Sequence, residues 1–201
     1  MFQTGRMNDA LHPSFKEASE AWATRVRGDR EQVVAFREEP ERSDFYGPIA
    51  ANFKADPRRE GDPVLNILGG FVQSGETWMD IGAGGGRLGL GIALVARELI
   101  AVEPSEGMLA VLRESMTEYG VTNVRIVQSR WPMANAPRAD VSFISGVGND
   151  IEDFGAFIDA MEESTERLCV AVQPSRPPAS FSYPFWPDVH GGGARAVAMP
   201  A

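Results

Sequence analysis

The spacing of apolar positions changes twice along the chain and divides the sequence into three parts. Before about residue 75 these positions recur every three or four residues, as at Phe15, Ala18, Trp22 and Val26, which predicts helices with one apolar face. From residue 77 to residue 173, short apolar runs of strand length alternate with segments of helical spacing. The predicted strands are 78–81, 99–103, 124–128, 141–145 and 168–173, and the predicted helices between them are 88–97, 105–119 and 152–167.

Strands that alternate with helices pair in parallel through right-handed crossovers. Because the runs are almost wholly apolar, helices must cover the sheet on both faces. The sequence therefore predicts an α/β fold with a doubly wound, Rossmann-like, mostly parallel sheet. We expect residues 1–75 to form an N-terminal helical lid and substrate region, and residues 76–173 to form the core. Residues 174–201 form a Pro-rich tail, in which dense prolines disfavour a central strand.

The composition narrows the partners. With 19 Lys and Arg against 28 Asp and Glu, the formal net charge is −9, and no long basic cluster is present. This balance predicts that neither nucleic acid nor a membrane surface is a partner. The single cysteine, Cys169, excludes an internal disulfide and a Cys-based zinc site, so no metal site is expected. No apolar run has the roughly 20 residues of a membrane helix, and no signal peptide is recognised, which predicts a soluble, cytoplasmic protein.

The chemically informative stretch is a buried strand that runs through Asp80 into a glycine loop, 82–86, and then into a helix. Glycines at such a junction let a ligand approach the backbone closely, next to the unpaired N–H groups of the helix start. Glu103 follows Gly82 by 21 residues, at the predicted end of the next strand. A carboxylate there is placed to accept both hydroxyls of a ribose. Together these features predict a nucleoside-containing ligand.

Two ligand classes fit the loop, because residues 84–89 also satisfy the dinucleotide pattern G-x-G-x-x-G. Asp80 favours the other class, since a carboxylate near the loop repels a pyrophosphate and attracts a cationic amino acid or sulfonium group. Asp80 as a simple helix cap is the competing interpretation. For Asn149, after the fourth strand, a substrate-side role and a turn role stay equally open, and for Trp131 so do stacking on a purine and edge packing.

Three segments in order resemble motifs of the class I S-adenosylmethionine-dependent methyltransferases: 80–86, 101–109 and 139–145. The resemblance covers about residues 77–173. It implies S-adenosyl-L-methionine as the cofactor and methyl transfer as the activity, to a small-molecule acceptor chosen by elimination. A catalytically silent nucleoside-binding regulator and, less favoured, an NAD-dependent oxidoreductase are the alternatives.

The resemblance also implies roles for individual residues. Asp80, Gly82 and Gly84 are expected along the methionine part of the cofactor, Glu103 on its ribose and Met108 under its adenine. The family's acidic residue after the third strand is missing, so the residues that follow this strand must replace it. The full set of expected cofactor-binding residues is Asp80, Gly82, Ala83, Gly84, Gly86, Glu103, Pro104, Met108, Ser129, Arg130, Trp131 and Ser145. Substrate-side candidates are Tyr46, Gly146 and Asn149; no catalytic residue is assigned.

One departure concerns the end of the sheet. The family normally finishes with an antiparallel pair of strands, and nothing after residue 173 has the pattern of either. We therefore expect a sheet without the last strands of the family, in a chain that is truncated or ends its sheet unusually. An uncovered edge strand or the aromatic residues of the tail would then favour a homo-oligomer.

Overall fold

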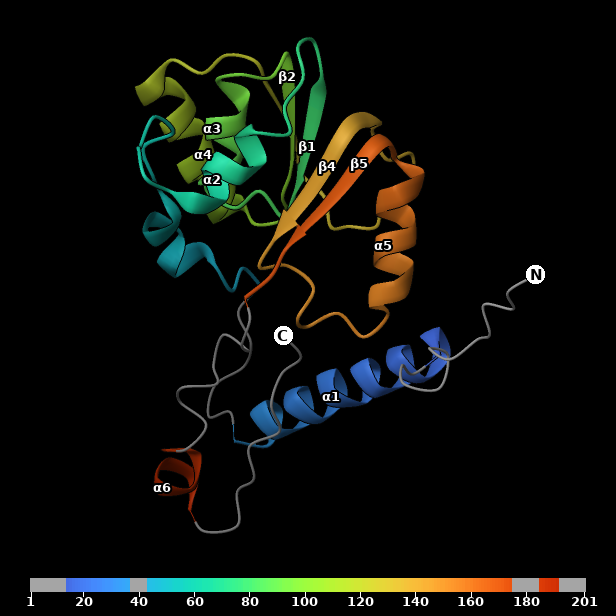
Figure 1. Cartoon of the computed structure of the whole chain (residues 1–201). Helices are drawn as coiled ribbons and strands as arrows, with labels where there is room; N and C mark the ends of the chain where they lie inside the picture. The colour runs from blue at the N-terminus through green and yellow to red at the C-terminus, as the bar shows by residue number, and fades with distance from the viewer. Residues whose placement is uncertain (1–13, 37–42, 175–184, 192–201) are drawn as a thin grey trace, which may run out of the picture. The chain divides into compact units, whose positions relative to one another are not determined.

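The structure, a computed structural model, describes residues 14–36, 43–174 and 185–191 (Figure 1). They fall into two compact units: residues 43–147 with 156–173, and residues 14–36 and 148–155 with 174 and 185–191. By packing, residues 43–74 therefore belong with the sheet. The predicted division into lid, core and tail is a functional one and stays a prediction. Most of the predicted tail lies outside the described residues.

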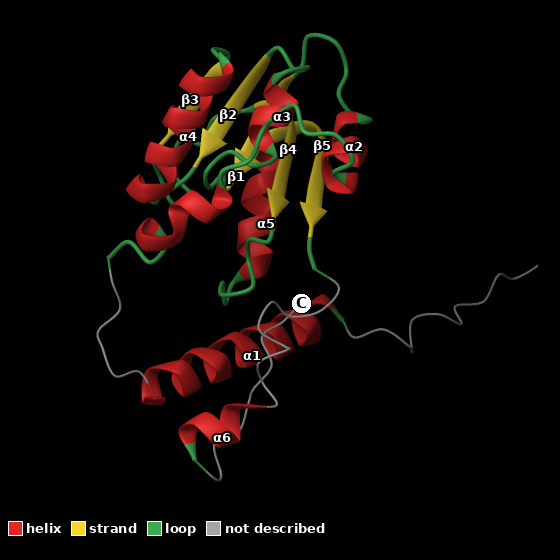
Figure 2. Ribbon diagram, turned by 90° about the vertical axis from the view of Figure 1, so that its left-hand side faces the viewer, coloured by secondary structure: helices red, strands yellow, loops and turns green. Residues whose placement is uncertain are grey.

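The larger unit is built on a five-stranded sheet in which all neighbours pair in parallel, in the order β3-β2-β1-β4-β5 (Figure 2). The predicted fold class is confirmed. From β1 the chain adds β2 and β3 on one side and then β4 and β5 on the other, so the strand order reverses between β1 and β4. In doubly wound sheets, ligands bind at the carboxyl ends of the strands beside such a switch point. The strands are β1 (Thr77–Ile81), β2 (Glu98–Val102), β3 (Val124–Val127), β4 (Ala139–Ser145) and β5 (Thr165–Val172).

Helices cover the sheet on both faces, as its apolar strands require. The helices α2 (Pro63–Gly69), α3 (Gly89–Ala93) and α4 (Glu106–Tyr119) lie on one face and α5 (Phe154–Glu163) on the other (Figures 1 and 2). Every residue of β1 is buried. Trp78 of β1 and Phe143 of β4 make an edge-to-face contact with ring centroids 6.1 Å apart. The central strands are thus held by the apolar core, which fixes where their carboxyl ends lie.

Two element boundaries differ from those predicted. The helix predicted over 152–167 ends at Glu163, and β5 begins at Thr165, because Thr165 pairs with Ala139 of β4. The helix predicted over 88–97 is regular only as α3, residues Gly89–Ala93, and the Asn123 side-chain amide donates to the Ala93 and Ala96 carbonyls at the turn that follows. In both places the strand or turn gains tertiary contacts that local spacing does not encode.

The smaller unit contains α1 (Phe15–Phe36), which contacts the loop between β4 and α5. Trp22 stacks on Phe154 with ring centroids 5.0 Å apart, and its indole N–H donates to the Ile151 carbonyl at 2.8 Å. Arg27 and Arg30 both pair with Glu152. The unit also contains a short helix, α6 (Trp186–His190).

Within the described residues the sheet has no strand beyond β5, which leaves β5 at an edge. Segments 175–184 and 192–201 lie outside the description. None of the described helices combines the length and the apolar character needed to cross a membrane.

Candidate functional site

The site predicted from the sequence assembles at the carboxyl edge of the sheet, where β1 and β2 end side by side. Ile81 pairs with Val102, and the N–H groups of Gly82 and Ala83 both donate to the Val102 carbonyl, at 2.8 and 3.1 Å. This pairing brings the start of the glycine loop against the end of β2. Asp80 and Glu103 thereby reach the same edge.

Asp80 is buried, with 3% of its surface exposed. Burial first, and the charge of Glu103 second, raise the pKa of its carboxyl from 3.8 to about 8, and the Gly89 N–H opposes them. That contact is the helix-capping interaction considered above, since Gly89 begins α3. A buried carboxyl that one N–H does not compensate favours either a proton or a cationic partner. Capping and ligand binding are therefore compatible roles for Asp80.

Glu103 links the two segments that flank the site. Its Oε2 accepts from the Gly84 N–H at 2.9 Å, and its Oε1 accepts from the Ser105 N–H at 2.8 Å. Burial raises the pKa of this carboxyl, the two N–H groups lower it, the charge of Asp44 raises it and that of Arg130 lowers it. A carboxylate oxygen accepts more than one hydrogen bond, so both oxygens retain capacity for ligand hydroxyls.

The glycine loop requires glycine at defined positions. Gly82 has φ 79°, and a Cβ there would come within 2.5 Å of Val147 Cγ2. Gly84 also has a positive φ, of 53°, but a Cβ there would meet only the Met108 sulfur, at 3.7 Å. The loop is therefore tightly packed beneath Gly82 and open beside Gly84, where a ligand can approach the backbone.

Other expected residues are distributed around this centre. Ala83 and Gly86 of the loop are buried, and Met108 is buried beside Gly84 on α4. Pro104 is exposed directly after Glu103. The positions of these residues agree with roles near a ligand, which stay predictions.

The residues after β3 lie differently. The Trp131 indole N–H donates to the Phe157 carbonyl at 3.2 Å, and the two rings make an edge-to-face contact. Ser129 Oγ donates to the neighbouring Arg130 carbonyl. These contacts favour the packing role over purine stacking for Trp131. Arg130 is exposed, and its charge reaches Glu103.

The substrate-side candidates do not fall into one cluster by their contacts. Ser145 ends β4, and the Gly146 N–H continues its pairing by donating to the Val172 carbonyl at 3.0 Å. Asn149 is buried and groups with the smaller unit; its side-chain oxygen has no hydrogen-bond partner among the described residues. Tyr46 is 45% exposed and lies edge-on to Phe53 in the larger unit.

Sequence reasoning missed Asp44, which precedes the 3₁₀ helix η1 (Gly47–Phe53). Its carboxylate accepts hydrogen bonds from Ser105 Oγ and the Gly107 N–H, at 2.7 and 3.0 Å. These partners are 61 and 63 residues away in the sequence. No local pattern connects such distant positions, so nothing in the sequence signalled the contact.

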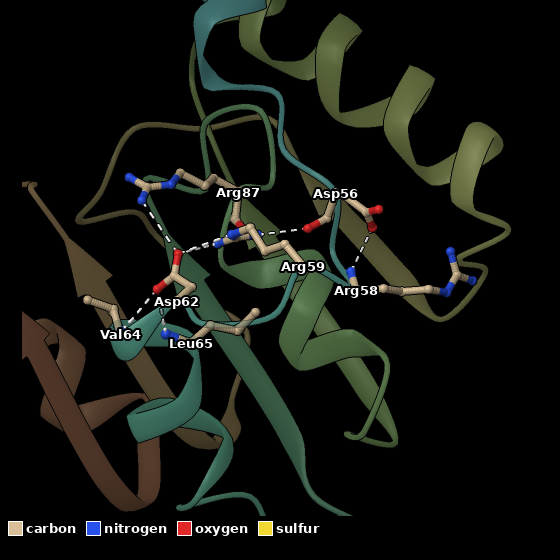
Figure 3. A network of polar contacts seen from close by, with 7 residues as sticks. All are labelled: Asp56, Arg58, Arg59, Asp62, Val64, Leu65 and Arg87. Carbon is tan, nitrogen blue, oxygen red and sulfur yellow. Dashed lines mark hydrogen bonds and ion pairs between the residues drawn. The ribbon is translucent and has the colours of Figure 1, made fainter.

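A second network supports the glycine loop from outside (Figure 3). The Arg59 guanidinium donates to the Arg87 carbonyl at 2.8 Å and to Asp62 Oδ2 at 2.8 and 3.1 Å. The other oxygen of Asp62 accepts from the Val64 and Leu65 N–H groups and caps α2. Arg59 thus ties the end of the glycine loop to the start of α2.

The described residues contain no group of three or more His, Cys, Asp or Glu side chains that could hold a metal ion. The geometry therefore offers two buried acidic groups, a glycine loop and a helix start. This set suits an organic ligand that carries hydroxyls and a positive charge.

Comparison with known proteins agrees with this description. No protein-family model matches the sequence. A stretch of 97 residues, 42% of this chain, is 27% identical to the ribosomal RNA small subunit methyltransferase G of Neisseria meningitidis serogroup C and spans 47% of that relative. A putative S-adenosyl-L-methionine-dependent methyltransferase of Methanococcus maripaludis superposes with a TM-score of 0.55, 14% identity and coverage of 77% of this chain and 78% of that one. The chain resembles the class I S-adenosylmethionine-dependent methyltransferases in sequence and fold.

A methyltransferase fold is also shared with coclaurine N-methyltransferase bound to N-methylheliamine and SAH, with a TM-score of 0.52 and 14% identity over 79% of this chain and 52% of that one. The resemblance to methyltransferases expected from the three motifs is therefore confirmed. The chain spans about half the length of the curated relative it matches over the longer stretch.

One prediction from composition is wrong. The net charge of −9 led us to exclude nucleic acid as a partner, and with it to prefer a small-molecule substrate. The curated relatives, from two Neisseria species, are named as ribosomal RNA methyltransferases. Net charge averages over the whole surface, whereas an acceptor is bound by a local part of it, so the exclusion does not follow.

Proposed function

We propose that this protein transfers a methyl group from S-adenosyl-L-methionine to an acceptor. The observation that carries the proposal is the pair of buried carboxyls, Asp80 and Glu103, at the ends of two adjacent parallel strands beside a glycine loop. S-adenosyl-L-methionine carries a sulfonium, an ammonium and a ribose, which match an uncompensated acidic group and a hydroxyl acceptor. The methyltransferase relatives support the same cofactor and enzyme class.

The proposed roles follow the two carboxyls. Asp80 would attract the positively charged methionine part, with the open backbone at Gly84 beside it. Glu103 would accept the ribose hydroxyls while the N–H groups of Gly84 and Ser105 hold its orientation. Met108, buried next to Gly84, would pack against the adenine side of the cofactor.

The bound cofactor would supply an already activated methyl group on its sulfur. The residues of this chain then have to align the acceptor with the methyl–sulfur bond and exclude water. Rigid packing beneath Gly82 and the buried position of Asp80 serve both needs. No residue is assigned as a base, because alignment supplies much of the required acceleration.

The names of the curated relatives favour RNA as the acceptor class to test before any other. The acceptor atom is left to experiment. The predicted cytoplasmic location agrees with an RNA acceptor but is untested.

Calorimetric titration of the purified chain with S-adenosyl-L-methionine tests the cofactor. Binding should weaken at least about tenfold in Asp80→Ala and in Glu103→Gln, because each loses a charged contact. Glu98→Gln is the matched control, since Glu98 begins β2 and therefore lies at the amino end of the strand that Glu103 follows. The proposal is wrong if the wild-type protein does not bind S-adenosyl-L-methionine at a high micromolar concentration of this cofactor.

The same preparation separates the alternatives. Thermal protection by NADH but not by S-adenosyl-L-methionine would select the oxidoreductase. Tight cofactor binding without turnover on RNA and on a small-molecule panel would select a silent binding protein. Methyl transfer from labelled cofactor to ribosomal RNA is the outcome that supports the enzyme.

A further inference from the structure

Asp44 holds a segment of the chain against the edge of the proposed cofactor site. Its Oδ1 accepts from Ser105 Oγ at 2.7 Å and from the Gly47 N–H at 3.0 Å, and its Oδ2 accepts from the Gly107 N–H at 3.0 Å. Ser105 and Gly107 stand at the start of α4, directly after Glu103. One carboxylate therefore fastens the beginning of η1 to the helix that follows the ribose-binding position.

The segment that Asp44 fastens approaches the site at Gly47 and at Phe53. A Cβ on Gly107 would come within 2.5 Å of the Gly47 Cα, so the two backbones touch. A Cβ on Gly85 of the glycine loop would meet the Phe53 carbonyl oxygen at 3.1 Å. At the far end of η1, Lys54 forms ion pairs of 2.6 Å with both Glu114 and Glu118 of α4. We define residues 44–54 as the strap.

A continuous chain of hydrogen bonds leads from the strap to the candidate ribose contact. Asp44 accepts from Ser105 Oγ, the Ser105 N–H donates to Glu103 Oε1, and the Gly84 N–H donates to Glu103 Oε2. Ser105 Oγ also accepts from the Met108 N–H at 3.1 Å, which fixes its rotamer as the cap of α4. Asp44 thus limits the freedom of the residue that orients Glu103.

We propose that Asp44 is a positioning residue of the cofactor site, which acts through Ser105 to orient Glu103 for the ribose. The proposal rests on the proposed function. It assigns to the strap a role in cofactor affinity that is distinct from its packing on α4. Asp44 makes no hydrogen bond to Glu103 or to the glycine loop, so its effect on the orientation of Glu103 is transmitted through Ser105.

The charge of Asp44 also acts on Glu103 through space, in addition to the hydrogen bonds through Ser105. The groups whose charges act on Glu103 or are acted on by it are Asp44, Arg130 and Asp80. The negative charge of Asp44 raises the pKa of Glu103. Asp44→Asn removes that charge, so the pKa of Glu103 should fall while its orientation loosens. The two consequences move different measurements.

The experiment is calorimetric titration of wild type and Asp44→Asn with S-adenosyl-L-methionine and with methylthioadenosine, between about pH 5 and about pH 8. Both ligands carry the ribose, so we expect both to bind about fivefold more weakly at neutral pH. The acidic limb of the affinity profile should move to lower pH in the variant. Asp80 titrates in both proteins, and the comparison between them isolates the change at Glu103.

Asp56→Asn is the matched control, because Asp56 lies just beyond the strap. Among the contacts that the structure describes, its carboxylate accepts only from the nearby Arg58 N–H. It should leave both affinities unchanged. Ser105→Ala breaks the relay from the other side and covers the case in which Asp44→Asn folds poorly. If the relay exists, the double variant should lose less affinity than the two single variants together.

The outcomes are distinct. Wild type that binds no S-adenosyl-L-methionine overturns the proposed function and this proposal with it. Wild type that binds, with unchanged affinity and pH profile in folded Asp44→Asn and additive effects with Ser105→Ala, overturns this proposal alone. Weaker binding in Asp44→Asn with effects that add to those of Ser105→Ala also overturns it, because that result shows that Asp44 does not act through Ser105.

Discussion

Replacing Asp80 by Asn should stabilise the free protein while it weakens cofactor binding. Asn has nearly the same shape and its side-chain oxygen can still accept from the Gly89 N–H, but it carries no ionisable proton. In the wild type, burial and the charge of Glu103 raise the pKa of Asp80 from 3.8 to about 8. The native state therefore holds a proton on this group that the unfolded chain has already released.

The sign of the pH dependence follows from that difference. Between about pH 4 and about pH 8 the native state binds more protons than the unfolded state, so the free energy of unfolding falls as the pH rises. Each pH unit in this window corresponds to about 1.4 kcal/mol. At about pH 7 the burial of Asp80 therefore costs about 4 kcal/mol as an upper bound. Asp80→Asn removes this cost, but the unpaired N–H of its buried amide should itself cost about 1–3 kcal/mol of stability.

Urea denaturation of wild type and Asp80→Asn across the same window measures the effect. The difference between the two free energies of unfolding should grow with pH, because the other titrating groups are common to both proteins. Calorimetry in two buffers of different ionisation enthalpy should show proton release when S-adenosyl-L-methionine binds to the wild type, and none with Asp80→Asn. Glu98→Gln is the control for a lost carboxylate at the half-buried start of β2, where Glu98 pairs with Arg125.

A free-energy difference that stays constant from about pH 5 to about pH 8 would refute the reasoning. It would mean that Asp80 is ionised in the free protein and has a compensating partner. Proton release that persists in Asp80→Asn would place the titrating group elsewhere, with Glu103 as the nearest alternative, since burial raises its pKa as well.

Three further variants test the supports of the site. Arg59→Ala should lower the free energy of unfolding by about 1–3 kcal/mol, because it removes the hydrogen bonds that join the glycine loop to α2. Arg58→Ala is the control: it loses a ring contact of 6.0 Å and a surface hydrogen bond, both with Tyr119, and should cost less in the same urea titration. Gly82→Ala should cost about 2–4 kcal/mol in thermal or chemical denaturation, since φ is 79° and its Cβ would meet Val147 at 2.5 Å; full stability would contradict the loop geometry. Trp22→Ala should speed amide exchange of residues 148–155 more than that of β1, because the stack and the indole hydrogen bond hold that loop; equal protection in both proteins would count against it.

The sheet could be predicted because its strands are short, apolar and regularly spaced, and because parallel pairing leaves few topologies. The placement of Asp80 and Glu103 followed for the same reason: both end strands that must lie side by side. The limits of β5 could not be predicted, because Thr165 and Arg167 look helical in local spacing. Their strand conformation depends on pairing with β4 and on the ion pair between Arg167 and Glu76.

The contacts of Asp44 and Trp131 could not be predicted from the sequence for a different reason. Asp44 acts on a helix start more than 60 residues away, and Trp131 packs against Phe157, 26 residues later. Neither pairing leaves a periodic trace in the chain. The exclusion of nucleic acid failed in a third way, since it drew a local conclusion from a global charge.

The charged groups at the site favour a cationic ligand. Asp80, Glu103 and Asp44 bring three carboxyls toward one edge of the sheet, while Arg130 is the basic residue whose charge lowers the pKa of Glu103. Burial first, and the charge of Glu103 second, raise the pKa of Asp80, and the Gly89 N–H opposes them. A cation bound beside Asp80 would lower that pKa and replace the proton, so affinity should rise with pH, and proton release should fall toward zero as the pH passes about 8. A ligand whose affinity falls as Asp80 ionises cannot be the one this site is built to hold.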